Sequence, residues 1–281
     1  NSLQMGMVSA ERIFQILETE SNIKNQGTFI PKNVKGNIKL DRLEFSYKPG
    51  ETVLHKISLD ISAGETIAIV GATGAGKSTI INLLSRFYEF ESGDITIDGV
   101  SIISYDLKSL REQVSVVLQD VFLFADTLYN NITLFNPKIS KEKVIKASRE
   151  IGSHEFIENL PGGYDFNVKE RGLMLSSGQR QLIAFLRAYI SEPAILVLDE
   201  ATSSVDSYNE EIIQQAIETI TKGKTSIVIA HRLATVKNAD RIVVLDKGHI
   251  VEQGTHKQLL KIEEGYYSKL YEVQFAEDIL V

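Results

Sequence analysis

Residues 66–78 read TIAIVGATGAGKS, an aliphatic run followed by a glycine-rich turn that ends in Lys77 and Ser78. The run is typical of a parallel strand that is covered on both faces. Glycines allow the turn to point successive backbone N–H groups inward, and the residues that follow predict a helix whose N-terminus adds a partial positive charge. A phosphate-binding loop requires this order of strand, turn and helix.

The turn therefore predicts a site for the phosphates of a nucleotide. Lys77 should reach the β- and γ-phosphates, and the Ser78 hydroxyl should be a ligand of Mg²⁺. A glycine-rich turn that binds nothing is the simpler alternative. The residues expected to hold the nucleotide are Gly71, Ala72, Thr73, Gly74, Ala75, Gly76, Lys77, Ser78 and Thr79.

Outward from this loop, the sequence predicts an α/β fold with a mostly parallel sheet. Further aliphatic runs rich in Ile and Val predict buried parallel strands, and helical patterns lie between them. Strand alternating with helix is typical of a doubly wound core. The predicted strands are 66–70, 194–198, 226–230 and 242–245, and the predicted helices are 77–87, 179–190 and 207–221.

Two other regions have different patterns. Residues 38–47 and 57–61 alternate apolar and polar side chains, which predicts antiparallel strands with one exposed face. The span from about 120 to 190 contains several helical patterns and no convincing buried strand, so we expect a helical lobe inserted into the core. The domain as a whole is expected to cover residues 36–281.

The first 35 residues predict a helix and a connector. Apolar residues recur at three- and four-residue steps, as in an amphipathic helix, and one interpretation is that this helix packs on the domain. These residues are Met7, Ala10, Ile13, Phe14 and Leu17. Residues 21–35 are polar, contain Gly27 and Pro31, and have no sustained period, which favours a linker.

Composition excludes several classes of function. The chain of 281 residues has a net charge of −7 and no basic run, which argues against nucleic acid as the main partner. It has no cysteine, so a thiol nucleophile and a cysteine-ligated metal are excluded. Its apolar runs are too short to span a bilayer. Because it begins at Asn1 and has no signal peptide, we expect a piece of a longer protein.

A second motif supplies carboxylates. Residues 195–200 read ILVLDE, a buried strand that delivers Asp199 and Glu200 at its carboxyl end, where open α/β sheets place their ligands. Asp199 should hold Mg²⁺, directly or through water. Glu200 can accept a proton from an attacking water. Charged residues at a strand end often form only a solvated loop, but the phosphate loop favours the functional interpretation.

Residues 175–181 read LSSGQRQ. Together with the phosphate loop at 71–78 and the carboxylate motif at 195–200, they resemble the nucleotide-binding domain of ATP-binding-cassette transporters, and the exporter type most of all. The resemblance covers residues 36–274. It implies a P-loop NTPase core, an N-terminal antiparallel β subdomain and an inserted helical subdomain at about 120–190. It also implies ATP and Mg²⁺ as ligands.

The resemblance assigns roles to single residues. Tyr47 would stack on adenine, Gln119 would contact the metal and water, and His231 would lie near the γ-phosphate as a switch. Asp206 would be the aspartate of the loop that follows the carboxylate motif. Residues 169–172, KERG, would touch the intracellular helices of a membrane domain. The expected catalytic residues are Lys77, Gln119, Glu200 and His231, and the expected metal ligands are Ser78, Gln119 and Asp199.

The signature segment should form a second anion site. It precedes a helical stretch, so its N–H groups and the helix dipole favour negative charge. In this family the site faces the ATP held by the opposite subunit, which implies a head-to-tail dimer with two shared nucleotides. The residues expected at this contact are Ser176, Ser177, Gly178 and Gln179.

One departure from the family pattern bears on the partner. The usual signature has two glycines, and here Ser177 occupies the first position while Glu200 is retained. This combination slightly favours a heterodimer over a homodimer, with a partner chain whose own catalytic glutamate is replaced.

The resemblance thus implies a Mg²⁺-dependent ATPase motor at the cytoplasmic face of the membrane. Residues 9–17, SAERIFQIL, resemble the segment that joins an exporter's membrane domain to its ATPase domain, although this piece itself is expected to be soluble. An ATP-gated regulatory module without hydrolysis is the main alternative. A chromosome-maintenance ATPase would need long coiled coils before the signature, and the sequence has none. The transported substrate is not predicted.

Overall fold

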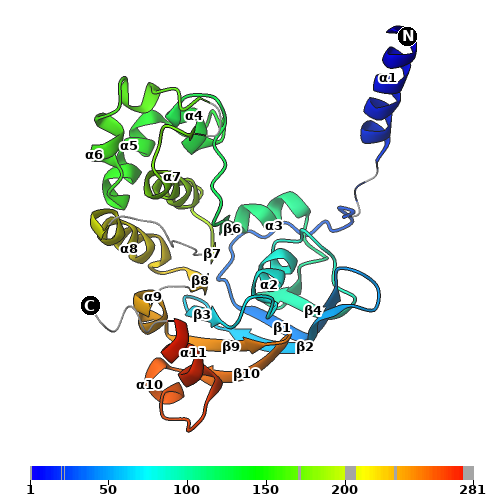
Figure 1. Ribbon diagram of the computed structural model, residues 1–281, viewed down its shortest axis with the longest axis vertical. Helices are drawn as coiled ribbons and strands as arrows, with labels where there is room; N and C mark the ends of the chain where they lie inside the picture. The colour runs from blue at the N-terminus through cyan, green and yellow to red at the C-terminus, as the bar shows by residue number, and fades with distance from the viewer. Residues whose placement is uncertain are drawn as a thin grey trace.

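The computed structural model describes residues 2–19, 21, 23–169, 172–199, 207–230 and 233–274 of the chain. These residues form two β-sheets, a lobe of helices and a separate N-terminal helix (Figure 1). The predicted α/β class, with a mostly parallel sheet and a smaller antiparallel one, is confirmed.

The smaller sheet is antiparallel, and one of its faces is buried. Along its first strand, the side chains of Ile38 and Leu40 are buried, whereas those of Lys39 and Asp41 are exposed, as the alternating sequence predicts. In the order β2-β1-β4-β5, the strands are β2 (Thr52–Ile61), β1 (Ile38–Ser46), β4 (Ser92–Ile97) and β5 (Val100–Ser101).

The larger sheet has six strands, of which the last along the chain is antiparallel to its neighbour and the others are parallel. In spatial order they are β10 (His249–Gly254), β9 (Arg241–Asp246), β3 (Thr66–Val70), β8 (Thr225–Ile229), β7 (Ile195–Asp199) and β6 (Val114–Val117).

The parallel strands separate two hydrophobic cores. On β3, Ile67 and Ile69 pack in one core with the buried face of the antiparallel sheet. Ala68 and Val70 point to the opposite face, where they share a core with the helical lobe. Because both faces of the strand are covered, its residues from Ile67 to Val70 are all aliphatic.

Helices cover both faces of the larger sheet. Around the sheets lie α2 (Lys77–Leu84), α3 (Leu107–Gln113), α9 (Leu233–Asn238), α10 (His256–Leu259) and α11 (Tyr266–Gln274). Between β6 and β7 the chain forms α4 (Leu128–Thr133), α5 (Lys141–Ile151), α6 (His154–Glu158), the 3₁₀ turn η1 (Gly163–Asp165) and α7 (Ser177–Ile190), and α8 (Ser207–Thr221) packs against α5 and α7.

The N-terminal helix α1 (Ser2–Glu18) stands apart from the sheets and from the helical lobe (Figure 1). Its apolar side chains are exposed, with Ile16 at 75% and Leu17 at 73% of full exposure. The interpretation that this helix packs on the domain is therefore wrong for the described residues. No helix in the described part of the chain has both the length and the hydropathy needed to cross a membrane.

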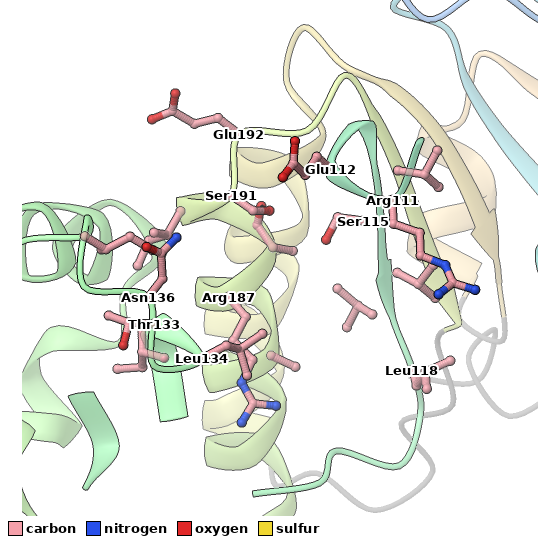
Figure 2. Close-up of a pocket in the computed structure, with 18 of the residues that line it drawn as sticks. Arg111, Glu112, Ser115, Leu118, Thr133, Leu134, Asn136, Arg187, Ser191 and Glu192 are labelled. Atoms are coloured by element: carbon pink, nitrogen blue, oxygen red, sulfur yellow. The ribbon is translucent and has the colours of Figure 1, made fainter. Parts of the chain in front are cut away.

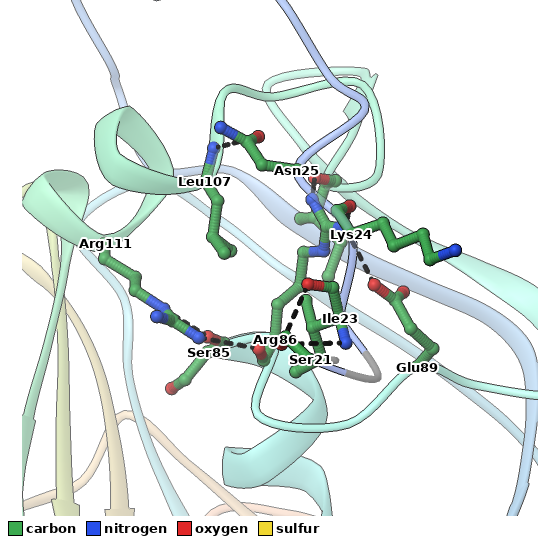
Figure 3. A network of polar contacts seen from close by, with 10 residues as sticks. Ser21, Ile23, Lys24, Asn25, Ser85, Arg86, Glu89, Leu107 and Arg111 are labelled. Carbon is green, nitrogen blue, oxygen red and sulfur yellow. Dashed lines mark hydrogen bonds and ion pairs between the residues drawn. The ribbon is translucent and has the colours of Figure 1, made fainter. Parts of the chain in front are cut away.

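The connector after α1 is attached to the body of the protein through Arg86 (Figure 3). This buried side chain lies just after α2. Its guanidinium donates hydrogen bonds to the carbonyl oxygens of Lys24 (3.4 Å) and Ile102 (3.2 Å), and it pairs with the Glu89 carboxylate (2.7 Å). One buried cation thus joins the connector to the helix that carries Lys77.

A second set of contacts extends the attachment. The Asn25 side chain donates to the Asp106 carboxylate (2.8 Å) and accepts from the Leu107 N–H (2.9 Å). The first of these bonds helps to hold the pKa of Asp106 below its usual value. Phe29 packs edge-on against the ring of Tyr105, with ring centroids 4.9 Å apart. Residues 24–29, expected as a plain linker, are therefore part of the packed structure.

Asn131 and Arg187 join the helical lobe to the segment that follows β6. The buried Asn131 side chain accepts from the N–H of Phe124 (2.8 Å) and donates to the carbonyl oxygens of Phe124 and Thr127 (both 3.0 Å). From α7, Arg187 donates to the backbone oxygens of Asn131 (2.8 Å) and Phe122 (2.9 Å). Burial lowers the pKa of Arg187 to about 10.

We predict that Asn131→Leu destabilises the chain by about 2–4 kcal/mol, because it leaves several buried backbone groups without hydrogen bonds. Urea denaturation followed by circular dichroism measures the loss. Asn159→Leu is the control, since Asn159 is exposed at the end of α6, and we expect a change within about 0.5 kcal/mol. If Asn131→Leu lowers the stability no more than Asn159→Leu does, Asn131 does not hold the helical lobe to the segment after β6 in the way described.

Candidate functional site

The glycine-rich turn lies between β3 and α2, where two of its glycines have no room for a side chain. At Gly71, an added Cβ would collide with the carbonyl oxygen of Leu245 on β9. At Gly76, where φ is 103°, an added Cβ would lie 2.7 Å from Cδ2 of Leu54 on β2. The shape of the loop is therefore fixed by the strands that surround it.

Lys77 places its ammonium group inside this loop. The side chain is buried, and its Nζ donates hydrogen bonds to the carbonyl oxygens of Gly71 (2.7 Å) and Ala72 (3.0 Å). Burial lowers the pKa of Lys77, and the negative charge of Asp199 opposes that change. The loop thus holds a desolvated cation that donates hydrogen bonds to two neutral carbonyl oxygens.

The first turn of α2 adds backbone donors to the same place. Its N-cap is Gly76, which has no side chain that could cap the helix, and Ser78 is exposed in the first turn. Helix N-termini without a side-chain cap bind anions through their N–H groups and dipole. The loop, the Lys77 ammonium group and the N-terminus of α2 together form a site whose shape and positive charge suit a phosphate group.

Tyr47 follows the end of β1 with its ring 45% exposed. The ring packs edge-on against Phe45 and Tyr88, with ring centroids 4.8 Å and 5.0 Å apart. Its hydroxyl lies 3.2 Å from the Thr79 hydroxyl, in the first turn of α2. The aromatic side chain expected to contact the base therefore lies beside the phosphate loop.

Asp199 and Gln119 lie at the carboxyl edge of the same sheet. Val117 of β6 pairs with Leu198 of β7, and Asp199 pairs with Ile229 of β8, which is also the partner of Ile69 on β3. Gln119 is exposed two residues beyond the end of β6. A carboxylate residue and an amide residue from neighbouring segments therefore lie at the edge at which β3 ends, and side-chain oxygens of these types are the kind that Mg²⁺ prefers.

Several predicted site residues lie outside the described residues. Glu200 directly follows β7 and His231 comes two residues after the end of β8, but neither is described, and the same holds for Asp206. Glu170 and Arg171 of the predicted membrane-contact loop are likewise outside the described ranges, whereas the flanking Lys169 and Gly172 are described. The roles of these residues stay predictions.

The signature segment forms the N-terminus of α7, in the helical lobe and apart from the phosphate loop (Figure 1). Ser176 is the N-cap, and its hydroxyl accepts from the Gln179 N–H (3.2 Å) while its own N–H donates to Oε1 of Gln179 (3.0 Å). This capping box uses two of the four backbone N–H groups that we expect to face an anion. The first-turn N–H groups outside the box belong to Ser177 and Gly178.

A groove that no local sequence pattern predicts lies between the core and the helical lobe (Figure 2). Its volume is about 1200 Å³. Arg111, Ser115 and Leu118 line it on the side of α3 and β6, and Leu134 and Arg187 line it on the side of the lobe. These residues come from distant parts of the sequence, so no motif links them.

Comparisons with known proteins agree with this geometry. A sequence profile of the family described as ABC transporter matches residues 54–203. The chain is 49% identical over 280 residues to the uncharacterised ABC transporter ATP-binding protein YknV of Bacillus subtilis, covering 99% of this chain and 46% of YknV. It is 47% identical over 276 residues to an ATP-dependent lipid A-core flippase of Shewanella oneidensis, covering 97% of this chain and 46% of the flippase.

A third relative is a probable multidrug resistance ABC transporter ATP-binding/permease protein of Bacillus subtilis, YheH, at 44% identity over 274 residues, with 98% of this chain and 40% of YheH covered. The chain thus spans less than half the length of these relatives.

Among solved structures, a bacterial Atm1-family ABC exporter with ATP bound superposes with a TM-score of 0.85 at 36% sequence identity, over 96% of this chain and 47% of the exporter chain. The family profile covers more than half of this chain, and the relatives match this chain almost from end to end. The chain belongs to the ABC transporter family.

Proposed function

We propose that this chain is the ATP-binding and ATP-hydrolysing motor of an exporter. The observation that carries the proposal is the buried Lys77 ammonium inside the phosphate loop, at the sheet edge that also presents Asp199. The similar proteins support the direction of transport, because one of them is named as a flippase and the similar solved structure is that of an exporter. The transported substrate is not assigned.

Some residues of the site bind the nucleotide, and others take part in the hydrolysis step. Lys77 and the first-turn N–H groups of α2 bind the β- and γ-phosphates and offset the charge that moves between them during cleavage. Tyr47 contacts the base. Glu200, which follows Asp199 in the sequence, accepts the proton of the attacking water, and His231 contacts the γ-phosphate.

Magnesium fits the ligands at the sheet edge. The Ser78 hydroxyl, the Gln119 amide oxygen and the Asp199 carboxylate are hard oxygen donors, the class that Mg²⁺ prefers. When bound, the ion would neutralise part of the negative charge between the β- and γ-phosphates.

The motor and a non-hydrolysing, ATP-gated module differ in their response to Glu200→Gln. For the motor, we expect phosphate release to fall by about 10²- to 10⁴-fold while ATP binding is retained, because a positioned base is lost and the phosphate loop is unchanged. Phosphate release and equilibrium ATP binding measure the two effects. If the unchanged chain, tested with its partner, has no ATPase activity to lose, the module is the better description.

The magnesium proposal has its own test. Chelation by EDTA should abolish phosphate release, and added Mg²⁺ should restore it. Ser78→Ala should raise the Mg²⁺ concentration needed for half-maximal activity, because it removes one oxygen ligand. Ser191→Ala, outside the site at the end of α7, should leave that concentration unchanged. Full activity in EDTA would refute the assigned ligands.

We further propose that the active unit is a head-to-tail dimer in which each ATP contacts the phosphate loop of one chain and the signature of the other. The contact on the signature side would come from the first turn of α7, which begins with Ser177 and Gly178 after the Ser176 N-cap. Ser177 stands where the family pattern has glycine and Glu200 is retained, so the dimer is proposed to contain an unlike partner whose catalytic glutamate is replaced.

A shared site predicts that ATP turnover depends on the partner. The full-length protein purified alone should hydrolyse ATP at most at about a tenth of the rate reached after the unlike chain is added, since each site needs a signature from the other chain. Phosphate release measured across a dilution series gives the answer. A dilute monomer whose turnover per chain is independent of concentration would exclude a shared site.

The groove between the core and the lobe is proposed as the docking surface for a membrane domain of the same transporter. One relative, YheH, is named as both ATP-binding protein and permease, and this chain matches only part of it. Gly172, the last residue of the predicted membrane-contact loop, lies against Leu123, whose neighbour Phe122 lines the groove. Such docking would hold the chain at the cytoplasmic face of the membrane.

A further inference from the structure

The Tyr47 hydroxyl is held by the helix that carries the phosphate loop. Asn82 donates a hydrogen bond from Nδ2 to the phenol oxygen (3.1 Å), and the phenol in turn donates to the Thr79 hydroxyl (3.2 Å). Thr79 and Asn82 are three residues apart on α2, so they occupy one face of the helix. Thr79 directly follows Lys77 and Ser78 in the first turn, and Asn82 lies about one turn further on.

These two bonds are more than an incidental surface contact. Thr79 is buried, Asn82 is half-buried, and the ring between them packs edge-on against the buried Phe45. Hydrogen bonds in such a chain polarise one another, so the Asn82 donor strengthens the bond that Tyr47 makes to Thr79. The ring is therefore held at both ends, by Phe45 at its edge and by α2 at its hydroxyl.

We infer that Asn82 and Thr79 are positioning residues for base recognition. They hold the Tyr47 ring at a fixed place relative to the phosphate loop, where it can contact the base. The inference rests on the proposed function, in which Tyr47 contacts the base of ATP. A half-exposed tyrosine without these bonds would lose rotational freedom each time a nucleotide binds. A ring held in advance avoids that cost, so the affinity for the whole nucleotide rises.

One helix, α2, supplies both the N–H groups that bind the phosphates and the side chains that anchor the Tyr47 ring. The contacts to the base and to the phosphates are therefore positioned by the same rigid element. Thr79 also belongs to the expected phosphate site, whereas Asn82 and the phenol do not, so removing the Asn82 amide or the phenol oxygen leaves every expected phosphate contact in place. Stacking on an aromatic ring depends little on which base is present. The anchor should therefore act equally on ATP and GTP, and it should not act on inorganic tripolyphosphate, which has no base.

The test compares Asn82→Leu, which keeps a branched side chain of similar size without the donor, with Tyr47→Phe, which removes only the phenol oxygen. Isothermal titration in Mg²⁺ measures the Kd for ATP, GTP and tripolyphosphate. We expect Asn82→Leu to weaken ATP and GTP binding about three- to ten-fold, the size of the one neutral hydrogen bond that it removes. Tyr47→Phe breaks both bonds of the phenol and should weaken binding at least as much, and both variants should leave tripolyphosphate within about two-fold of the unchanged chain. The double variant should bind ATP no more weakly than Tyr47→Phe alone, because loss of the phenol oxygen already breaks the bond from Asn82.

Tyr266→Phe is the matched control, because Tyr266 is a half-exposed tyrosine on α11, and its ATP affinity should equal that of the unchanged chain. If Asn82→Leu misfolds, as thermal unfolding would show, Tyr47→Phe decides the question, since loss of one oxygen from a half-exposed ring preserves the fold. Unchanged ATP affinity, an equal loss for tripolyphosphate, or losses that multiply in the double variant would each overturn the inference. An unchanged chain that binds ATP no better than Lys77→Ala would overturn the proposed function and the inference with it.

Discussion

The close approach of the phosphate loop to the turn between β9 and β10 joins the two sheets. The Gly248 N–H donates to the Ala75 carbonyl oxygen in the loop (3.0 Å), and the Gly248 carbonyl oxygen accepts from the His55 N–H on β2 (3.0 Å). An added Cβ at Gly248 would collide with the carbonyl oxygen of Val53. A single glycine therefore lets the antiparallel sheet, the parallel sheet and the loop meet, and the position of Tyr47 relative to Lys77 depends on that junction.

Burial on both faces explains which parts of the fold can be predicted from the sequence. The strands β3, β7, β8 and β9 lie inside the sheet, so their residues are aliphatic at nearly every position and their sequences are unmistakable. The outer strands β6 and β10 carry partly buried residues and give no such pattern. The predicted helix at 77–87 ends at Leu84 in the structure, because Ser85 is its C-cap and the chain turns there.

Some parts of the candidate site can likewise be predicted from local sequence, and others cannot. The phosphate loop depends on contiguous residues, so Gly71 and Lys77 could be assigned from their spacing alone. The capping box of Ser176 and Gln179 also depends on a local pattern, a serine followed three residues later by a glutamine. The groove near Arg187 and the attachment of the connector through Arg86 depend on contacts between residues far apart in the sequence, which no local pattern encodes.

The attachment of residues 24–29 has a consequence for where the packed domain begins. The first strand starts at Ile38, and a fragment cut just before it would keep every strand. Such a fragment would nevertheless uncover one face of Tyr105, leave Asp106 without its amide partner and open the pocket of Arg86 to solvent. The smallest fragment that retains the native packing therefore begins near residue 23.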